Sequence, residues 1–235
     1  MKSTLPRIAC FHGGGSTAPI FKLQCTQLER AVEDAFKLVY FDGPFTAPAG
    51  AGILPAFRDF APFKSWFTKD AHGADYPDGS GYDSIGRDGV ERVWKMMEED
   101  DSSSGSWVGV LGFSQGTRIA SGLLLDQQRR KRMGELAEGG IELLFGVIYM
   151  GAYGPMESEI AHRACDDDER ISIPTIHVHG LKDAVLPLCR ENLAAYFDSS
   201  AATLFEINYH HAMPWAKGDA VGLANRMREM YGWVK

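Results

Sequence analysis

The chain has 235 residues, of which 45% are apolar and 23% are charged, a composition that predicts one globular domain spanning 1–235. The formal net charge of −7 argues against nucleic acid as the main partner, and four scattered cysteines favour reduced thiols. No apolar run reaches the ~20 residues that a membrane span needs, and no signal peptide is visible, so we expect a cytoplasmic protein without membrane contact.

The first elements along the chain alternate between strand and helix. The apolar runs Arg7 to Phe11 and Lys37 to Phe41 predict two short strands, and residues 20–35 carry apolar side chains at helical spacing. A strand, a helix and a strand of these lengths form a right-handed crossover in a parallel sheet. A glycine-rich loop, His12 to Gly15, follows the first strand.

Residues 45–81 break this alternation. They are rich in proline, glycine, alanine and aromatic side chains and show no period of two. We interpret them as an excursion over the sheet edge, part loop and part short helix, of the kind that covers an active site. A small satellite core under a long loop is the alternative.

The rest of the chain resumes the α/β pattern. Apolar segments predict strands at 107–111, 144–150, 174–180 and 203–208, with helices at 82–99, after Ser114, at 188–197 and at the C-terminus. The basic run Arg129 to Arg132 suits the end of a helix capped by Gly134, with a patch for an acidic partner as the alternative. The expected architecture is α/β, a mostly parallel sheet of about six strands flanked by helices.

Residues Gly112 to Gly116 (GFSQG) lie between a predicted strand and a predicted helix. A G-x-S-x-G in that setting is the nucleophile elbow of the α/β-hydrolases, so the α/β-hydrolase fold is expected. The turn is so tight that a Cβ on either flanking residue would strike the neighbouring strand or helix. It exposes the serine, here Ser114, as a candidate nucleophile.

A serine nucleophile needs a base, and the base needs a carboxylate to orient it. On α/β-hydrolase sheets these residues follow strands in the order Ser, Asp or Glu, His. Ser114, Asp183 and His211 supply that order. Asp183 could instead cap a helix, and His210 is an adjacent candidate base, but the proline three residues after His211 favours His211.

The oxyanion of the reaction needs two backbone N–H donors. Gln115, directly after the nucleophile, is one candidate. The loop after the first strand should supply the other, and we assign it to Gly14, with Gly13 as the neighbouring alternative.

The sequence also contains partial motifs for nucleotide binding and for metal binding. Gly13, Gly15 and Ala18 match a loose G-x-G-x-x-A fingerprint, and Asp42 could then hold a ribose, as in a nucleotide-binding oxidoreductase. That interpretation does not explain why Ser114, Asp183 and His211 occur in the order of a catalytic triad. His177 and His179 share one strand face, but no third ligand at matching spacing supports a metal site, so we expect no metal.

Several motifs together resemble the fungal family serine hydrolases, and the resemblance covers nearly the whole chain. One difference is that Tyr209 and His210 stand where the family often has two glycines, which predicts a crowded pocket rim. The motifs that carry the resemblance are His12 to Gly15, Asp42 to Pro44, Ser65 to Phe67, Gly112 to Gly116, Pro174 to Pro187 and His211 to Pro214.

The resemblance implies a cofactor-independent Ser-His-Asp hydrolase that cleaves a thioester or ester of a hydrophobic or polyketide acyl group. An acyl carrier domain of a polyketide synthase is then a possible partner. A generalist carboxylesterase and a non-catalytic binding protein are the alternatives. The aromatic-rich excursion fits an apolar acyl pocket, for which the candidate residues are Phe60, Phe63, Trp66, Phe67 and Tyr153.

Overall fold

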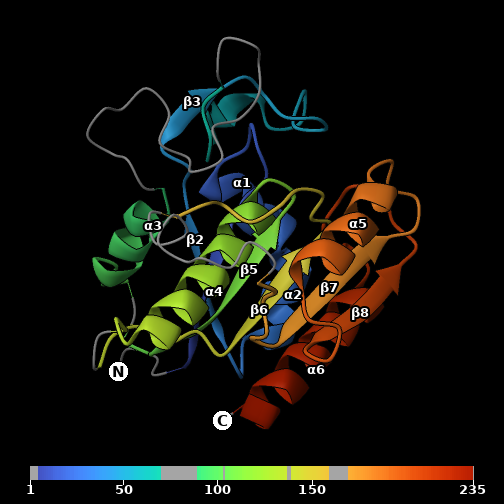
Figure 1. Ribbon diagram of the computed structural model, residues 1–235. Helices are drawn as coiled ribbons and strands as arrows, with labels where there is room; N and C mark the ends of the chain where they lie inside the picture. The colour runs from blue at the N-terminus through green and yellow to red at the C-terminus, as the bar shows by residue number, and fades with distance from the viewer. Residues whose placement is uncertain (1–4, 70–88, 103, 137–138, 159–168, 235) are drawn as a thin grey trace.

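The computed structural model describes residues 5–69, 89–102, 104–136, 139–158 and 169–234. Its centre is a six-stranded parallel sheet in the order β2-β1-β5-β6-β7-β8 (Figure 1). This confirms the α/β-hydrolase architecture expected from the sequence. The strands are β1 (Arg7–Phe11), β2 (Lys37–Phe41), β5 (Trp107–Phe113), β6 (Phe145–Tyr149), β7 (Thr175–Gly180) and β8 (Ala202–Ile207).

Helices cover both faces of the sheet, and each face has its own apolar core. Ile8 and Cys10 of β1 point into one core, whereas Ala9 and Phe11 point into the other. Strands that are buried on both faces have continuous apolar sequences, so their positions could be predicted from apolar runs. One face holds α1 (Ala18–Gln24), α2 (Thr26–Val32) and α6 (Lys217–Val234), and the other holds α3 (Gly89–Glu98), α4 (Gly116–Met133) and α5 (Leu186–Tyr196).

The single helix expected over 20–35 is two helices. Cys25 ends α1 and begins α2 with φ −86° and ψ 4°, outside the helical range. The hydroxyl of Thr26 donates to the carbonyl of Leu23 at 2.6 Å. A side chain that bonds the local backbone in this way competes with helix continuation. Residues on both sides of the break, Leu23 and Thr26 among them, lie near the carboxyl edge of the sheet, where the candidate site lies.

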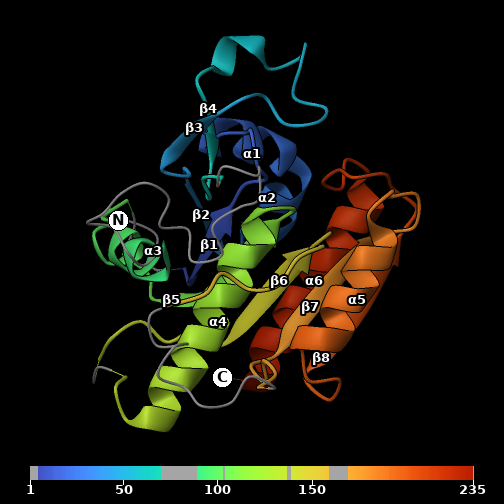
Figure 2. The same ribbon diagram turned by 45° about the horizontal axis from the view of Figure 1, so that its top comes forward.

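The excursion also differs from its prediction. It contains an antiparallel pair, β3 (Phe45–Ala47) with β4 (Phe63–Ser65), and a short 3-10 helix at Arg58–Phe60. Strands of three residues are too short for their alternation to show in a sequence. Figures 1 and 2 place this segment above α1, beyond the carboxyl ends of the strands. Residues 70–81, together with 82–88 of the next predicted helix, lie outside the described residues.

Ion pairs account for the basic run at the end of α4. Arg129 pairs with Glu169 at 3.0 Å, and Lys131 pairs with Glu142 at 3.1 Å. Gly134 caps the helix in the left-handed conformation with φ 71°, as the sequence predicted. The run therefore ends a helix and is paired within the chain.

A membrane-spanning helix would need a long apolar segment. In the parts of the chain that the structure describes, no helix is long and apolar enough to cross a bilayer.

Candidate active site

The elbow serine lies at the end of the central strand β5. Ser114 has φ 53°, a left-handed conformation that is uncommon for a residue with a side chain. A Cβ on Gly112 would lie 2.2 Å from the carbonyl oxygen of Gly116, and one on Gly116 would lie 2.0 Å from the carbonyl oxygen of Phe11. Both flanking positions must therefore be glycine, which confirms the steric reason given for the elbow.

The structure brings Asp183 and His211 together. The carboxylate Oδ2 of Asp183 lies 2.6 Å from Nδ1 of His211, and its Oδ1 accepts a hydrogen bond from the N–H of Val185 at 3.1 Å. The Asp183 side chain is 2% exposed, whereas that of His211 is 35% exposed. A buried carboxylate held at both oxygens orients the ring, and in the part of the chain that the structure describes no hydrogen bond uses its other nitrogen, Nε2.

The adjacent histidine is oriented differently. Nδ1 of His210 lies 3.1 Å from the carbonyl oxygen of Lys182, and its side chain is exposed. The His211 ring instead packs on Phe113, with ring centroids 5.0 Å apart. Phe113 directly precedes Ser114, so this contact holds the His211 imidazole beside the elbow. The geometry favours His211 over His210 as the base.

Two backbone N–H groups near Ser114 are available as donors. Within the described residues, no hydrogen bond uses the N–H of Gly14 or that of Gln115. Each follows a strand end, after β1 and β5 respectively, so the two groups approach the same edge of the sheet. This arrangement supports the assignment of both to an oxyanion hole.

The His12 side chain is a functional candidate that the sequence analysis missed. Its Nε2 accepts a hydrogen bond from the N–H of Gly43 at 2.9 Å, so Nδ1 carries the proton and donates to the carbonyl of Gly13 at 2.7 Å. Burial lowers the pKa of His12, which keeps the ring neutral. In a trans peptide the C=O and N–H point in opposite directions, so fixing the Gly13 carbonyl also fixes the N–H of Gly14.

The Gln115 side chain ties the elbow to the excursion. Its Oε1 accepts hydrogen bonds from the hydroxyl of Ser65 at 3.0 Å and from the N–H of Trp66 at 3.1 Å. The indole N–H of Trp66 donates to the carbonyl of His12 at 2.9 Å. Ser65 at the end of β4 and the next residue, Trp66, thus connect to both loops that would supply the oxyanion donors.

Replacing His12 with glutamine tests this positioning role. We expect kcat to fall on the order of 10²-fold with a smaller change in KM, because the Gly13–Gly14 peptide loses the group that orients it. Steady-state kinetics on a chromogenic ester measures kcat and KM separately, and circular dichroism checks that the variant is folded. An unchanged kcat in the folded variant would remove His12 from the account.

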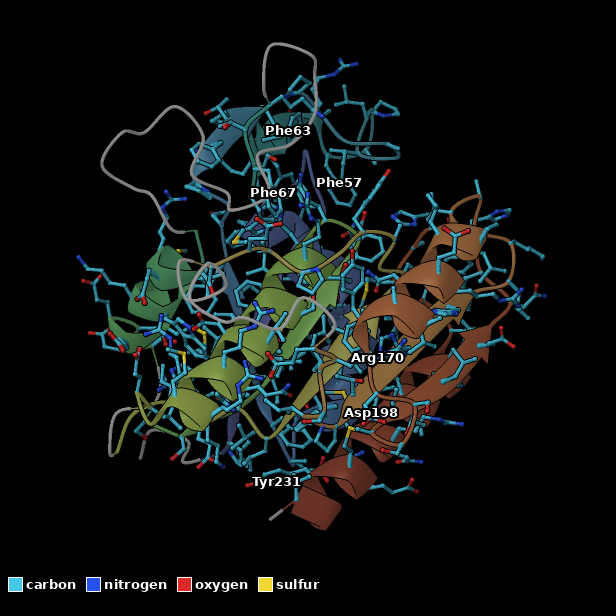
Figure 3. All side chains as sticks on the ribbon, in the orientation of Figure 1. Phe57, Phe63, Phe67, Arg170, Asp198 and Tyr231 are labelled. Atoms are coloured by element: carbon cyan, nitrogen blue, oxygen red, sulfur yellow. The ribbon has the colours of Figure 1, made fainter. Side chains whose placement is uncertain are left out.

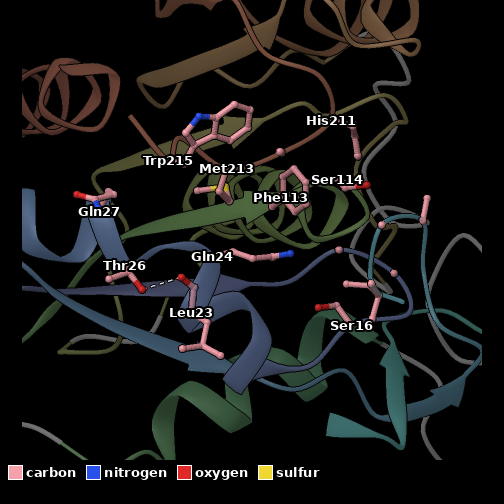
Figure 4. Close-up of a pocket in the computed structure, with 16 residues that line it drawn as sticks. Ser16, Leu23, Gln24, Thr26, Gln27, Phe113, Ser114, His211, Met213 and Trp215 are labelled. Atoms are coloured by element: carbon pink, nitrogen blue, oxygen red, sulfur yellow. Dashed lines mark hydrogen bonds between the residues drawn. The ribbon is translucent and has the colours of Figure 1, made fainter. Parts of the chain in front are cut away.

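A cavity of about 560 Å³ opens beside Ser114, and Figure 4 shows the residues that line it. Ser114 and His211 line it together. Its other walls come from α1 and the start of α2, from the loop at 51–53 and from the loop that carries Met213 and Trp215. The sequence did not indicate these walls, because three distant segments form them.

The five aromatic residues expected to line the acyl pocket do not line this cavity. The side chains of Phe63, Trp66 and Phe67 are buried in apolar clusters, and Figure 3 shows Phe63 and Phe67 within the segment above α1. Phe60 packs on Phe57 with ring centroids 5.9 Å apart, and Tyr153 is exposed. Phe63, Trp66 and Phe67 thus pack as a satellite core does, and the assignment of the five residues to an acyl pocket stays a prediction.

The two rival chemistries fit the structure poorly. Asp42 Oδ1 accepts a hydrogen bond from the N–H of Ala18 at 2.7 Å, so it stabilises the start of α1. His177 is buried, its Nε2 lies 3.1 Å from the Thr175 hydroxyl, and burial lowers its pKa to about 3. Among the described residues, no cluster of three or more His, Cys, Asp or Glu side chains could hold a metal.

A parallel sheet with a strained serine at the end of its central strand, and an Asp–His pair beyond two later strands, defines the α/β-hydrolase class. The chain belongs to the serine hydrolase (FSH1) family, which it matches over residues 1–221. This confirms the family resemblance seen in the sequence and makes the protein a serine hydrolase.

Similar proteins include fungal esterases. A probable esterase of Aspergillus terreus is 35% identical over 243 residues, covering 97% of this chain and 90% of that protein. Esterase dbaE of Emericella nidulans is 32% identical over 251 residues, covering 95% and 89% of the two chains.

Solved structures share the fold at low identity. An esterase of Pyrobaculum calidifontis superposes with a TM-score of 0.57 at 11% identity, over 100% of this chain and 79% of the other. The carboxylesterase of Bacillus cereus gives a TM-score of 0.56 at 15% identity, over 97% and 91%.

Proposed function

We propose that this protein hydrolyses an ester or thioester of a hydrophobic acyl group through an acyl-enzyme on Ser114. The main support is the 2.6 Å contact between His211 Nδ1 and Asp183 Oδ2 beside the cavity that Ser114 and His211 share. In this mechanism, Nε2 of His211 takes the proton from the Ser114 hydroxyl as its oxygen attacks the substrate carbonyl.

The remaining steps follow from the same groups. The N–H groups of Gly14 and Gln115 bind the oxyanion of the tetrahedral intermediate. When the intermediate collapses, the C–O or C–S bond breaks, and the leaving alcohol or thiol takes the proton from His211. A water molecule, deprotonated by His211, then attacks the acyl-Ser114 ester. The free acid is released and Ser114 recovers its proton. No cofactor takes part.

We further propose a polyketide acyl group on a carrier domain as the natural substrate, as the family resemblance implies. A generalist carboxylesterase is the second candidate, because the similar fungal proteins are named esterases. The two candidates differ in the leaving group and in the need for a carrier, and both use the same catalytic residues.

Matched substrates separate the two candidates. One acyl group is presented as an oxygen ester, as an N-acetylcysteamine thioester and as a thioester on an isolated acyl carrier domain. We expect kcat/KM to be highest for the carrier-bound thioester, by tenfold or more. Turnover of the oxygen ester alone would establish the carboxylesterase function and exclude release from a carrier.

A further inference from the structure

The cavity beside Ser114 carries a large aromatic side chain that the proposed chemistry does not use. Trp215 lines the cavity, yet its side chain is 61% exposed. It follows His211 by four residues, so the loop that supplies the base also supplies this indole. Trp215 is not isolated, because Leu23 and Met213 line the same cavity, and contiguous apolar surface of this kind is typical of binding grooves.

Trp215 is held in place from behind by Tyr209. The two ring centroids are 4.0 Å apart with the ring planes inclined at 60°. Tyr209 is buried, and its hydroxyl oxygen accepts a hydrogen bond from the N–H of Ala216 at 2.9 Å. The indole is thus fixed through its ring and through the backbone of the next residue. A wall fixed in this way loses little conformational entropy when a ligand binds.

The opposite wall of the cavity, formed by α1 and the start of α2, combines one aliphatic side chain with the polar side chains of Gln24, Thr26 and Gln27. Leu23 at the end of α1 lines the cavity with an exposed side chain, and Figure 4 shows Leu23 and Trp215 on opposite sides of it. Ile53 and Met213 add further apolar surface. The break between α1 and α2 therefore lies beside the cavity. The space between the two walls leads to Ser114, where the acyl carbonyl would have to lie.

We propose that this cavity is the acyl-binding subsite and that Trp215, positioned by Tyr209, makes it selective for flat aromatic acyl groups. The inference rests on the proposed acyl transfer to Ser114. An aromatic acyl group offers a π face or a ring edge to the indole, and such contacts add to the gain from apolar burial alone. A puckered aliphatic ring of the same carbon skeleton buries similar area without that addition.

Two matched esters test this selectivity. The 4-nitrophenyl esters of 2-naphthoic acid and of decahydro-2-naphthoic acid share a carbon skeleton and a leaving group. We expect the ratio of their kcat/KM values, aromatic over saturated, to fall about three- to tenfold in Trp215→Ala. Trp215→Phe keeps an aromatic wall and should restore most of the ratio. Tyr209→Leu removes the ring that supports the indole and should lower the ratio. A loss of folded protein would lower both kcat/KM values equally and leave their ratio unchanged.

Tyr196→Ala is the matched control, because the Tyr196 side chain is 40% exposed but does not line the cavity. Its ratio should equal that of the wild type. Equal ratios in the wild type and Trp215→Ala, with both esters hydrolysed, would overturn the selectivity and leave the acyl transfer intact. If neither ester turns over, the proposed function fails. Calorimetric binding of the two free acids to Ser114→Ala, with and without Trp215→Ala, then decides on the subsite. No loss of affinity for either acid in Trp215→Ala would overturn the subsite, and an equal loss for both acids would overturn the selectivity.

Discussion

His211→Ala should lower kcat on the order of 10⁴- to 10⁶-fold, whereas His210→Ala should change it less than about twofold. The two histidines are adjacent and exposed, but only the His211 ring contacts the buried Asp183 carboxylate, at 2.6 Å. Removing that ring leaves the Ser114 hydroxyl without a base. Asp183→Asn should cost about 10⁴-fold, because the amide fails to hold the correct tautomer of His211.

Steady-state kinetics of the variants on one chromogenic ester measures these effects. His210→Ala is a good control because it removes the same ring one residue away, and its Nδ1 contacts only the backbone carbonyl of Lys182. A large loss in His210→Ala with near-normal turnover in His211→Ala would exchange their roles. Comparable small losses in both would remove the histidine base from the mechanism.

Gly116→Ala should destabilise the protein by about 3 kcal/mol or more. The added Cβ would lie 2.0 Å from the carbonyl oxygen of Phe11 and 2.8 Å from that of His12. Both atoms belong to the backbone at the end of β1, so neither can move aside without disturbing the sheet and the loop that holds Gly14. The elbow and the oxyanion loop should therefore fail together.

Gly218→Ala is the matched control for this prediction. Gly218 also lies in the first turn of a helix, α6, but a Cβ there would meet nothing within 4 Å. Alanine at this position should be neutral or stabilise the helix by up to ~1 kcal/mol. Denaturant titration gives both free energies of unfolding. Equal stability of the two variants would show that the elbow tolerates a side chain at Gly116.

The sequence was sufficient for the features that local chemistry dictates. Buried parallel strands are apolar throughout, so most of the sheet could be read from apolar runs. The elbow needs glycine at 112 and 116 for steric reasons, and it identified Ser114 with its strand and helix. The order of the triad then selected Asp183 and His211, which the structure places in contact.

Features that depend on packing between distant segments could not be predicted. The packing of the aromatic residues in the excursion is one example, because composition does not show which way a side chain points. Most of them pack inward, and Trp66 and Gln115 join the excursion to the elbow. The cavity walls arise from the helix break at Cys25 and from Trp215, two features with no periodic signal.

The sequence contains an indication of the role of His12. A histidine directly before three glycines combines a rigid donor and acceptor with a very flexible backbone. Such a backbone needs an external group to hold one conformation, and the structure shows the His12 ring bonded to both Gly13 and Gly43. The short pair β3–β4, in contrast, had no signal, because three residues are too few for alternation to appear.

The most direct test of the proposed mechanism locates the covalent intermediate. The protein is treated with a fluorophosphonate, digested, and analysed by peptide mass spectrometry. The buried thiols should not compete, because burial raises the pKa of Cys189 to about 12 and that of Cys25 further. We expect one adduct, on Ser114, that is absent from Ser114→Ala and slow to form in His211→Ala. An adduct on any other residue, or equal labelling of Ser114→Ala, would contradict the account.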